Sequence, residues 1–249
     1  MATLSVIVIT KNEAESIETC LKSVRWADEI IVVDSGSTDG TVAICREYTD
    51  KIFVTDWPGF GAQKNRALDL ATGQWVLSLD ADEYSTPELR DEIKAAIKDP
   101  EGKVAFRMPR LSNYCGRFMR HSGWWPDYII RLFLRERGRF SDDLVHERLV
   151  VNGPTGTFSN PIIHKAFENL EEVIQTMNSY SLAGARMMHK EKRRSGLLIA
   201  LSHGFWSFVH TYIIRAGFLD GREGFMLAVS NAEGTYYRYL KLMFMEKEK

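Results

Sequence analysis

The chain has 249 residues, with 32 Lys and Arg against 33 Asp and Glu, and 45% of its residues are hydrophobic. This length and composition predict a globular protein with one large core or two small ones. The balanced charge argues against a nucleic-acid-binding protein, for which a basic excess is expected. Three cysteines without a CxxC pair argue against a disulfide framework or a zinc site and indicate a reducing compartment. The first apolar run lacks a basic start and ends at Lys11, so no signal peptide is expected and we predict a cytoplasmic location.

The first hundred residues alternate between short apolar runs and helical patterns. The apolar runs are rich in β-branched residues and too short for helices, which predicts buried strands over residues 4–9, 29–33, 51–54 and 75–79. Apolar residues at helical spacing predict helices over residues 15–25, 41–48, 62–71 and 88–98. Thr86 and Pro87 supply the N-cap and the first-turn proline of the last helix. This alternation predicts an α/β fold, with a mostly parallel sheet and helices on both faces.

After residue 100 the pattern changes. Residues 104–108 and 128–134 are predicted strands, and residues 170–189 are a predicted helix. We therefore expect one α/β domain over residues 1–165 and a helical C-terminal extension over residues 166–249.

Polar side chains follow every predicted strand of the first half. They are Thr10 to Glu13 after the first strand, Asp34 to Thr41 after the second, Gln63 to Arg66 in the helix after the third, and Asp80 to Glu83 after the fourth. Turns of α/β proteins are rich in such residues for conformational reasons alone. In parallel sheets, however, ligands bind beyond the carboxyl ends of the strands, so the recurrence favours a binding site.

The pair Asp80 and Asp82 follows a buried apolar strand and is succeeded by Glu83. Three neighbouring carboxylates favour a hard divalent cation, and Mg²⁺ and Mn²⁺ combine few protein oxygens with substrate phosphates. Such an ion would hold a diphosphate and neutralise a leaving group. An isolated DxD often arises by chance. Phosphatases with an aspartyl nucleophile also carry one, but at the end of the first strand.

Three motifs together resemble family 2 glycosyltransferases of the GT-A (Rossmann-like) fold over about residues 3–83. They are Thr-Lys-Asn-Glu after the first strand, Val-Val-Asp34-Ser-Gly-Ser-Thr-Asp39-Gly-Thr after the second, and Asp80-Ala-Asp82-Glu after the fourth. The resemblance implies an inverting transferase that uses a nucleotide-diphosphate sugar, usually a UDP-sugar, and a divalent metal, Mg²⁺ or Mn²⁺. It also implies a nucleotide-sugar half over about residues 1–100 and an acceptor half over about residues 101–165. Ser35 departs from the pattern, because many relatives carry a second Asp there, and this leaves base selectivity open.

The resemblance assigns nucleotide-binding roles to residues at all of these strand ends. They are Thr10, Asn12 and Glu13 for the nucleoside pocket, Asp34 for the uracil, Lys64 and Asn65 beside the nucleotide, and Asp80 for the ribose. Asp82 is the stronger metal candidate.

Motifs in the second half resemble the branch that adds glucose to the inner core of lipopolysaccharide. They are Gly123-Trp124-Trp125-Pro126-Asp127, Arg131-Leu-Phe, Val145-His146-Glu147 and Gly217-Phe-Leu-Asp-Gly221. The resemblance thus implies transfer of glucose from a UDP-sugar to the lipopolysaccharide inner core.

Inverting transfer needs a general base that removes the proton of the acceptor hydroxyl. Glu147 is the expected base and Asp143 the second candidate, while Asp142 fits a solvated turn equally well. His146 is a candidate ligand of metal or phosphate, and His164 is a further possible metal ligand, although a single His more often has a structural role.

The loop between the later strands offers aromatic and basic side chains. At least one of Trp124 and Trp125 is expected to pack in the core, and the other could present a flat face to a sugar ring. Arg117, Arg120 and Arg131 could meet acceptor phosphates, with solvated surface arginines as the alternative.

Residues 197–219 are long enough to cross a bilayer, which needs about 20 apolar residues. At 100° per residue, however, His203, Ser207, His210, Thr211 and Arg215 share one sector, opposite Leu201, Phe205, Phe208, Val209 and Tyr212. This predicts an amphipathic helix that does not span. A basic stretch over residues 186–194 precedes it, which suits peripheral binding to an anionic membrane at the cytoplasmic face of the inner membrane. Packing of the same face on the catalytic domain or a second subunit is the alternative.

Other functions stay open from the sequence. The acceptor could be a polyprenyl phosphate or another glycan, or the chain could be a nucleotide-sugar-binding or membrane-interacting module without turnover. A dinucleotide-binding oxidoreductase is disfavoured because no GxGxxG follows the first strand. A nucleotidyltransferase is disfavoured because Lys11, Asn12 and Glu13 stand where a glycine-rich basic loop is expected.

Overall fold

The structure, a computed structural model, describes residues 2–141 and 148–245. The chain forms two compact units, Met1–Arg110 with Asp127–Lys165 and Leu111–Pro126 with Ala166–Lys249. The second unit therefore includes a loop that the sequence did not assign to the C-terminal extension. The predicted residues Asp142, Asp143, His146 and Glu147 lie outside the described residues.

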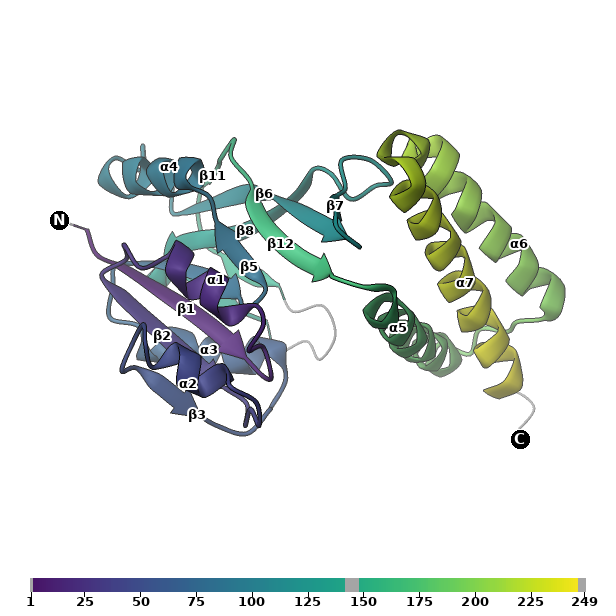
Figure 1. The fold of residues 1–249 in the computed structure, drawn as a ribbon, viewed down its shortest axis with the longest axis horizontal. Helices are drawn as coiled ribbons and strands as arrows, with labels where there is room; N and C mark the ends of the chain where they lie inside the picture. Colours follow the sequence, from purple (N-terminus) through teal and green to yellow (C-terminus); the bar gives the residue numbers. More distant parts are fainter. Residues whose placement is uncertain (1, 142–147, 246–249) are drawn as a thin grey trace. The chain divides into compact units, whose positions relative to one another are not determined.

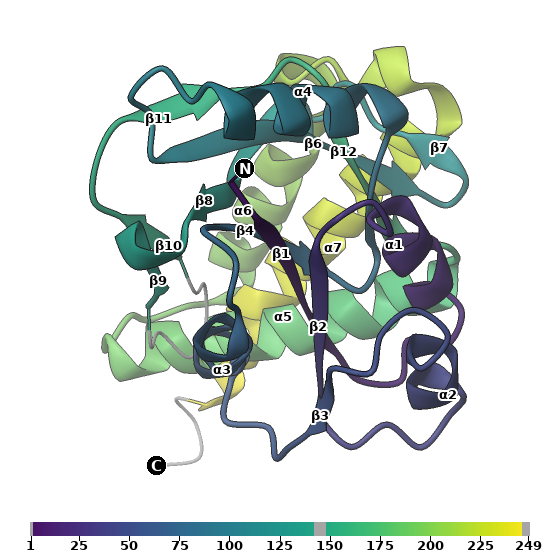
Figure 2. The same cartoon turned by 90° about the vertical axis from the view of Figure 1, so that its left-hand side faces the viewer.

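The main sheet is parallel over its first four strands and mostly antiparallel beyond them, where among the described pairings only that of β11 with β6 is parallel. Its order is β3-β2-β1-β4-β8-β6-β12-β5 (Figures 1 and 2). The parallel strands are β1 Leu4–Thr10, β2 Glu29–Asp34, β3 Ile52–Val54 and β4 Trp75–Asp80. The later strands are β5 Glu83–Ser85, β6 Ala105–Tyr114, β8 Asp127–Leu134 and β12 Ile162–Phe167. The remaining strands are short. They are β7 Arg117–Phe118, which pairs with β6, β11 Thr155–Thr157, which also pairs with β6, and β9 Gly138–Phe140 with β10 Leu149–Val151, which form a separate two-stranded sheet.

Both faces of this sheet are covered, because successive residues of a buried strand point to opposite sides. Val6 and Val8 of β1 enter one apolar cluster, and Ile7 and Ile9 enter the other. The helices on the first face are α1 Ile17–Ser23, α2 Thr41–Cys45 and α4 Pro87–Lys98, and the helix on the second is α3 Phe60–Leu70. The predicted α/β fold with a mostly parallel sheet is confirmed.

The predicted start of α4 is also confirmed. Thr86 accepts a hydrogen bond from the Leu89 backbone N–H with its side chain, and Pro87 occupies the first turn. Thr86 therefore satisfies one of the backbone donors that a helix start leaves unpaired.

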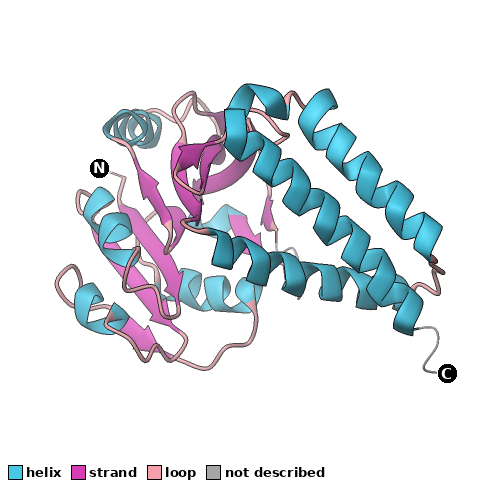
Figure 3. Ribbon diagram, turned by 45° about the vertical axis from the view of Figure 1, so that its right-hand side comes forward, coloured by secondary structure: helices cyan, strands magenta, loops and turns pink. Residues whose placement is uncertain are grey.

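The second unit is mainly helical (Figure 3). Its helices are α5 Leu170–Lys190, α6 Leu197–Val209 and α7 Gly221–Met245. The single predicted segment 197–219 is instead divided into α6, a π-helical turn His210–Ile214 and a 3-10 turn Gly217–Asp220. Another 3-10 turn, Arg135–Arg137, follows β8 in the first unit. By length and composition alone, Leu197–Ile214 is the one stretch of the described chain apolar enough to cross a membrane.

Glu29, at the start of β2, links three strands of the parallel sheet. Its carboxylate accepts hydrogen bonds from Ser5 on β1, from Lys51 just before β3, and from the N–H and hydroxyl of Thr72 just before β4. Burial alone would raise the pKa of Glu29, but these donors stabilise the anion and lower its pKa to about 2.

Because its pKa is depressed in the folded state, Glu29 contributes stability that is fully present above its unfolded pKa and is lost as the pH falls towards about 2. We compare the free energy of unfolding of wild type with that of Glu29→Gln. We expect the difference in favour of wild type to fall by about 2 kcal/mol between pH 5 and pH 3. Urea unfolding at a series of pH values measures this difference. Glu101→Gln, in an exposed turn, is the matched control and should show no such change. A wild-type advantage that stays constant over this range would contradict the account.

Candidate active site

The loops after β1 and β2 are held together by hydrogen bonds through predicted nucleotide-binding residues. Asn12 adopts a left-handed backbone conformation, with φ of 55°, and its side-chain oxygen accepts a hydrogen bond from the Thr38 N–H at 2.8 Å. The Glu13 N–H donates to Thr41 Oγ1 at 2.8 Å. Asp39 closes the same loop by accepting from the N–H of Ala14 and from Thr41. The two loops thus form one rigid edge at the carboxyl ends of the strands.

Asp34 and Thr10 lie beneath this edge. Asp34 is fully buried, and one carboxylate oxygen accepts from the N–H groups of Gly36 and Ser37, both at 2.9 Å, while the Ser37 hydroxyl donates to the other. Asp34 therefore shapes the loop that follows β2. Thr10 Oγ1 is buried and has no hydrogen-bond partner among the described residues. The structure places both residues together, and their contacts with a nucleotide stay a prediction.

Helix α3 contributes three buried polar residues, Gln63, Lys64 and Asn65. Gln63 donates from Nε2 to Ser35 Oγ and Thr55 Oγ1, each at 2.9 Å, which joins the helix to the loops after β2 and β3. Asn65 pairs with the backbone of Phe140, donating to its carbonyl at 2.9 Å and accepting from its N–H at 3.0 Å. Asn65 thereby anchors the end of β9. The hydrogen bonds between Asn65 and Phe140 do not test the predicted role of Asn65 beside the nucleotide, which stays a prediction.

Asp80 lies between two cations at the carboxyl end of β4. Its two carboxylate oxygens lie 2.8 Å from Lys64 Nζ and 2.5 Å from Arg131 Nη2. The same Arg131 nitrogen lies 2.6 Å from Glu83 Oε1, and Glu83 Oε2 accepts a hydrogen bond from the Asp80 N–H at 3.1 Å. Glu83 is fully buried, and the side chains of Lys64 and Arg131 are nearly so.

Burial and charge act against each other in this cluster. Burial alone would raise the pKa of Asp80, but Arg131 and Lys64 hold it well below its usual range, so Asp80 is an anion at neutral pH. For Glu83 burial dominates, and its pKa is raised. For Arg131, burial alone would lower the pKa, but Asp80 and Glu83 raise it above its ordinary value. Asp80 is thus already paired with two cations, while Asp82 is not part of this network.

Asp82 instead pairs with His164. Asp82 Oδ2 lies 3.1 Å from His164 Nε2, and the side chains are 30% and 19% exposed. The backbone holds the pair, since Lys165 N–H donates to the Asp82 carbonyl at 2.9 Å and His164 on β12 stands opposite Glu83 on β5. His164 was only a possible ligand in the sequence. Its register on β12, which no local pattern reveals, brings it to Asp82.

A carboxylate and an imidazole side by side fit a divalent cation. Mg²⁺ and Mn²⁺ are commonly held by one or two protein ligands, with substrate phosphates and water completing the coordination. Within residues 2–141 and 148–245, no cluster of three His, Cys, Asp or Glu side chains could hold a metal without such help. The donor set therefore suits an ion that is shared with a bound diphosphate.

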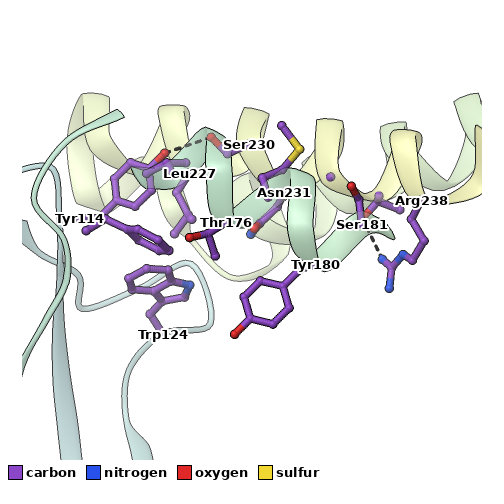
Figure 4. A pocket seen from close by; sticks show the side chains of 14 residues that line it. Tyr114, Trp124, Thr176, Tyr180, Ser181, Leu227, Ser230, Asn231 and Arg238 are labelled. Carbon is purple, nitrogen blue, oxygen red and sulfur yellow. Dashed lines mark hydrogen bonds between the residues drawn. The ribbon is translucent and has the colours of Figure 1, made fainter. Parts of the chain in front are cut away.

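The second unit contains a cavity of about 330 Å³ (Figure 4). Trp124 packs in its wall edge-on to Tyr114, with ring centroids 5.9 Å apart, and 6.2 Å from Phe167. The Tyr114 hydroxyl and Ser230 share a hydrogen bond of 3.0 Å, and Asn231 and Arg238 also line the cavity. Trp124 is therefore a packing residue. The Arg120 guanidinium lies over the Trp125 ring, with its carbon 5.5 Å from the ring centroid.

This sheet, with polar loops and an acidic pair at the carboxyl ends of its parallel strands, is that of the GT-A glycosyltransferases. The model of glycosyl transferase family 2 matches residues 5–152, more than half of the chain, and the chain belongs to this family.

The relatives in this family extend over nearly the whole chain. An uncharacterised glycosyltransferase of Rickettsia typhi is 29% identical, covering 97% of this chain and 87% of the relative. The lipopolysaccharide core biosynthesis glycosyltransferase LpsC of Rhizobium meliloti is also 29% identical, covering 95% of this chain and 89% of LpsC.

Among solved structures, S. aureus TarS is 19% identical with a TM-score of 0.49, covering 72% of this chain and 39% of TarS. Glucosyl-3-phosphoglycerate synthase of Mycobacterium tuberculosis, in complex with Mn²⁺ and UDP-glucose, is 26% identical with a TM-score of 0.39, covering 44% of each chain. This chain therefore spans less than half of the length of either structure.

The Arg131 bridge yields a stability prediction. In Arg131→Met the buried Glu83 and Asp80 lose a shared cation, and we expect the free energy of unfolding to fall by about 3–5 kcal/mol. Adding Glu83→Gln should recover at least about 1 kcal/mol, because it removes a buried carboxylate that would face only Arg110, at 3.8 Å.

Arg139→Met is the matched control, since Arg139 pairs with Asp69 and both side chains are 58% exposed. Loss of this exposed pair should cost about 1 kcal/mol or less. Urea unfolding of the three variants and wild type measures these values. Equal losses in Arg131→Met and Arg139→Met would rule out the buried bridge as a major source of stability.

Proposed function

We propose that this glycosyltransferase moves glucose from UDP-glucose to the inner core of lipopolysaccharide, with inversion at the anomeric carbon and with Mg²⁺ or Mn²⁺. The observation that carries the proposal is the pairing of Asp82 with His164 beside the Lys64–Asp80–Arg131 cluster, at the edge where parallel sheets bind ligands. Support for the acceptor comes from LpsC, a family relative over nearly the full chain that is named for lipopolysaccharide core biosynthesis.

The nucleotide is proposed to lie against the joined loops after β1 and β2. Asn12 and Glu13 are fixed there by the loop after β2, so the edge is formed before a ligand arrives. Thr10, whose buried hydroxyl lacks a partner in the described chain, and Asp34 line the same edge. A preformed polar edge lowers the entropy cost of binding a nucleotide.

Charge balance assigns the two aspartates of the DxD motif different tasks. Lys64 and Arg131 already neutralise Asp80, so Asp80 is suited to accept hydrogen bonds from a ribose and to keep both cations near the diphosphate. Asp82 and His164 would hold the metal, and a bound Mg²⁺ or Mn²⁺ would supply positive charge to the departing diphosphate. Lys64 stays oriented by Asp80, with its ammonium 2.8 Å from the carboxylate.

The acceptor hydroxyl must lose its proton as it attacks, opposite the leaving diphosphate. Glu147 is the proposed base and Asp143 the second candidate, with His146 as a further metal or phosphate ligand. These residues follow β9, whose last residue Phe140 is tied to Asn65 on α3 by two hydrogen bonds. We propose that the hydrogen bonds between Asn65 and Phe140 position the acceptor side of the site relative to the donor side.

A lipid-linked acceptor implies work at the cytoplasmic face of the inner membrane, and we propose that the enzyme is a peripheral membrane protein. A polyprenyl phosphate or another glycan as acceptor is the alternative. Transfer assays with heptose-containing core and with a sugar-free lipid phosphate distinguish the two.

The metal assignment is tested by titrating UDP with and without Mn²⁺. In wild type, Mn²⁺ should increase the affinity for UDP by more than about tenfold, because Asp82 and His164 would hold the ion and the ion would supply positive charge to the diphosphate. Asp82→Ala and His164→Ala should each abolish this gain and leave metal-free affinity unchanged. Asp91→Ala, an exposed aspartate on α4, is the control. Calorimetry that finds the full Mn²⁺ gain in Asp82→Ala would overturn the assignment.

The base is tested by Glu147→Gln, which keeps the size of the side chain but cannot take a proton. We expect transfer to slow by about 100-fold or more, with UDP affinity in Mn²⁺ unchanged. Asp143→Asn serves as the comparison and should have the smaller effect. Turnover of Glu147→Gln at the wild-type rate would show that Glu147 is not the base.

A further inference from the structure

Helix α6 is oriented with its large apolar side chains towards solvent. Leu198 is 81% exposed, Phe205 71% and Trp206 56%. We call the surface formed by these side chains the α6 outer face; its residues are Leu198, Leu201, Phe205 and Trp206 of α6 and Ile213 of the π-helical turn that follows, all exposed by half or more. A helix on the surface of a soluble protein normally shows the opposite arrangement, with its apolar stripe buried.

The side of α6 that packs on α7 is small and polar over most of its length, and near its end Phe208 packs edge-on against Phe225 of α7, with ring centroids 5.7 Å apart. Ala200 and Gly204 are buried, and a side chain at position 204 would meet Tyr236 at 3.2 Å. Ser207 donates a hydrogen bond to the Asn231 carbonyl at 3.2 Å, and the hydroxyl of Thr235 donates to Ser207.

Two further contacts continue this polar interface. The Asn231 amide donates to the buried Thr211, and the His203 ring stacks on Tyr239 with centroids 4.2 Å apart. Ser207 and Thr211 of the predicted polar sector therefore contact α7, but so do Phe208 and Tyr212 of the predicted apolar sector, through Phe225. Small residues and interhelical hydrogen bonds between helices, with apolar residues outside, are typical of helices whose surroundings are lipid.

Basic residues lie at both ends of α6. Between residues 186 and 222 the chain has seven Lys and Arg but only two acidic residues, Glu191 and Asp220. Lys190, Lys192 and Arg194 before α6 are exposed, as is Arg215 after it, whereas the exposed Arg222 is paired with Glu223. Of the two acids, Glu191 pairs with Arg193, and Asp220 is buried and accepts hydrogen bonds from the backbone around His121. An apolar helix face between basic ends complements the surface of an anionic bilayer.

Helix α7 indicates how deep α6 can lie. Helices α6 and α7 run antiparallel, side by side (Figures 1 and 3). Residue 203 contacts residue 239, residue 207 contacts residues 231 and 235, and residue 211 contacts residue 231. If α6 crossed the membrane, α7 would follow it with its charged residues Arg222, Glu223, Glu233, Arg238 and Lys241. Charges at the bilayer centre are costly, so α6 is suited to lie in the plane of the interface.

We propose that the α6 outer face inserts into the boundary between headgroups and acyl chains of an anionic membrane, with the basic residues at both ends bound to lipid phosphates. This inference deepens the proposed function, because it names the surface that would bring the enzyme to a lipid-linked acceptor. Arg215 and Lys192 mark the two ends of the bound segment.

The test is flotation of the full chain with vesicles of phosphatidylcholine, alone or with about 30% phosphatidylglycerol, an anionic lipid. Wild type should float with the anionic vesicles. Leu198→Glu/Phe205→Glu, which places two charges on the α6 outer face, should reduce the bound fraction by at least about tenfold. Val150→Glu, on the exposed side of β10 in the first unit, is the matched control and should float like wild type.

A second variant tests the charge contribution. Replacing Lys192, Arg193 and Arg194 by Gln should weaken partition onto anionic vesicles by about 100-fold, since each basic residue near such a surface contributes roughly fivefold. Flotation of either variant at the wild-type level, or failure of wild type to float, overturns the proposal.

Two further measurements separate this inference from its alternatives. UDP affinity in Mn²⁺ should be unchanged in all variants, so loss of vesicle binding is distinct from failure of the proposed function. If sedimentation shows that wild type is a dimer and Leu198→Glu/Phe205→Glu a monomer, and wild type does not float, the face binds a second copy instead and the membrane proposal is wrong.

Discussion

The site depends on the placement of Arg131 between Asp80 and Glu83. Without Arg131, the fully buried Glu83 would keep only Arg110, 3.8 Å away, and Asp80 would keep only Lys64. Arg131 comes from β8, which pairs antiparallel with β4, and so it joins the parallel half of the sheet to the antiparallel half. With Asp80 neutralised in this way, the negative charge available at the sheet edge belongs to Asp82. The division of tasks that we propose for Asp80 and Asp82 thus follows from burial.

The parallel half of the fold was predictable because its signals are local. The strands β1, β2 and β4 begin where the apolar runs begin, and the N-cap of α4 follows from Thr86 and Pro87. In the antiparallel half, β6 and β8 were predicted as strands, but their pairing was not, because it depends on register between distant strands. Arg131 reaches Asp80 across 51 positions, and Asn65 reaches Phe140 across 75. From the sequence we expected Arg131 near acceptor phosphates and Asn65 beside the nucleotide. No local pattern indicates that Arg131 pairs with Asp80 or that Asn65 pairs with Phe140.

The same limit applies to helix α6. The spacing of its residues predicts a polar and an apolar sector, but it does not indicate which side packs, and Phe208 and Tyr212 of the apolar sector pack against Phe225 of α7. The structure shows that Ser207 and Thr211 face α7, while Phe205 is exposed. Hydrogen-bonding residues on α7, above all Asn231, decide the orientation, because buried hydroxyl groups need partners. A catalytic unit organised by buried charge is therefore accompanied by a helical unit organised by buried polar contacts.

The most direct test of the central claim is an anomalous difference map from crystals of the full chain grown with UDP and Mn²⁺. The account predicts a manganese peak bonded to Asp82 and His164, with the diphosphate as a further ligand and the nucleoside against the loops after β1 and β2. A manganese peak away from both residues, or UDP bound elsewhere on the chain, would contradict it.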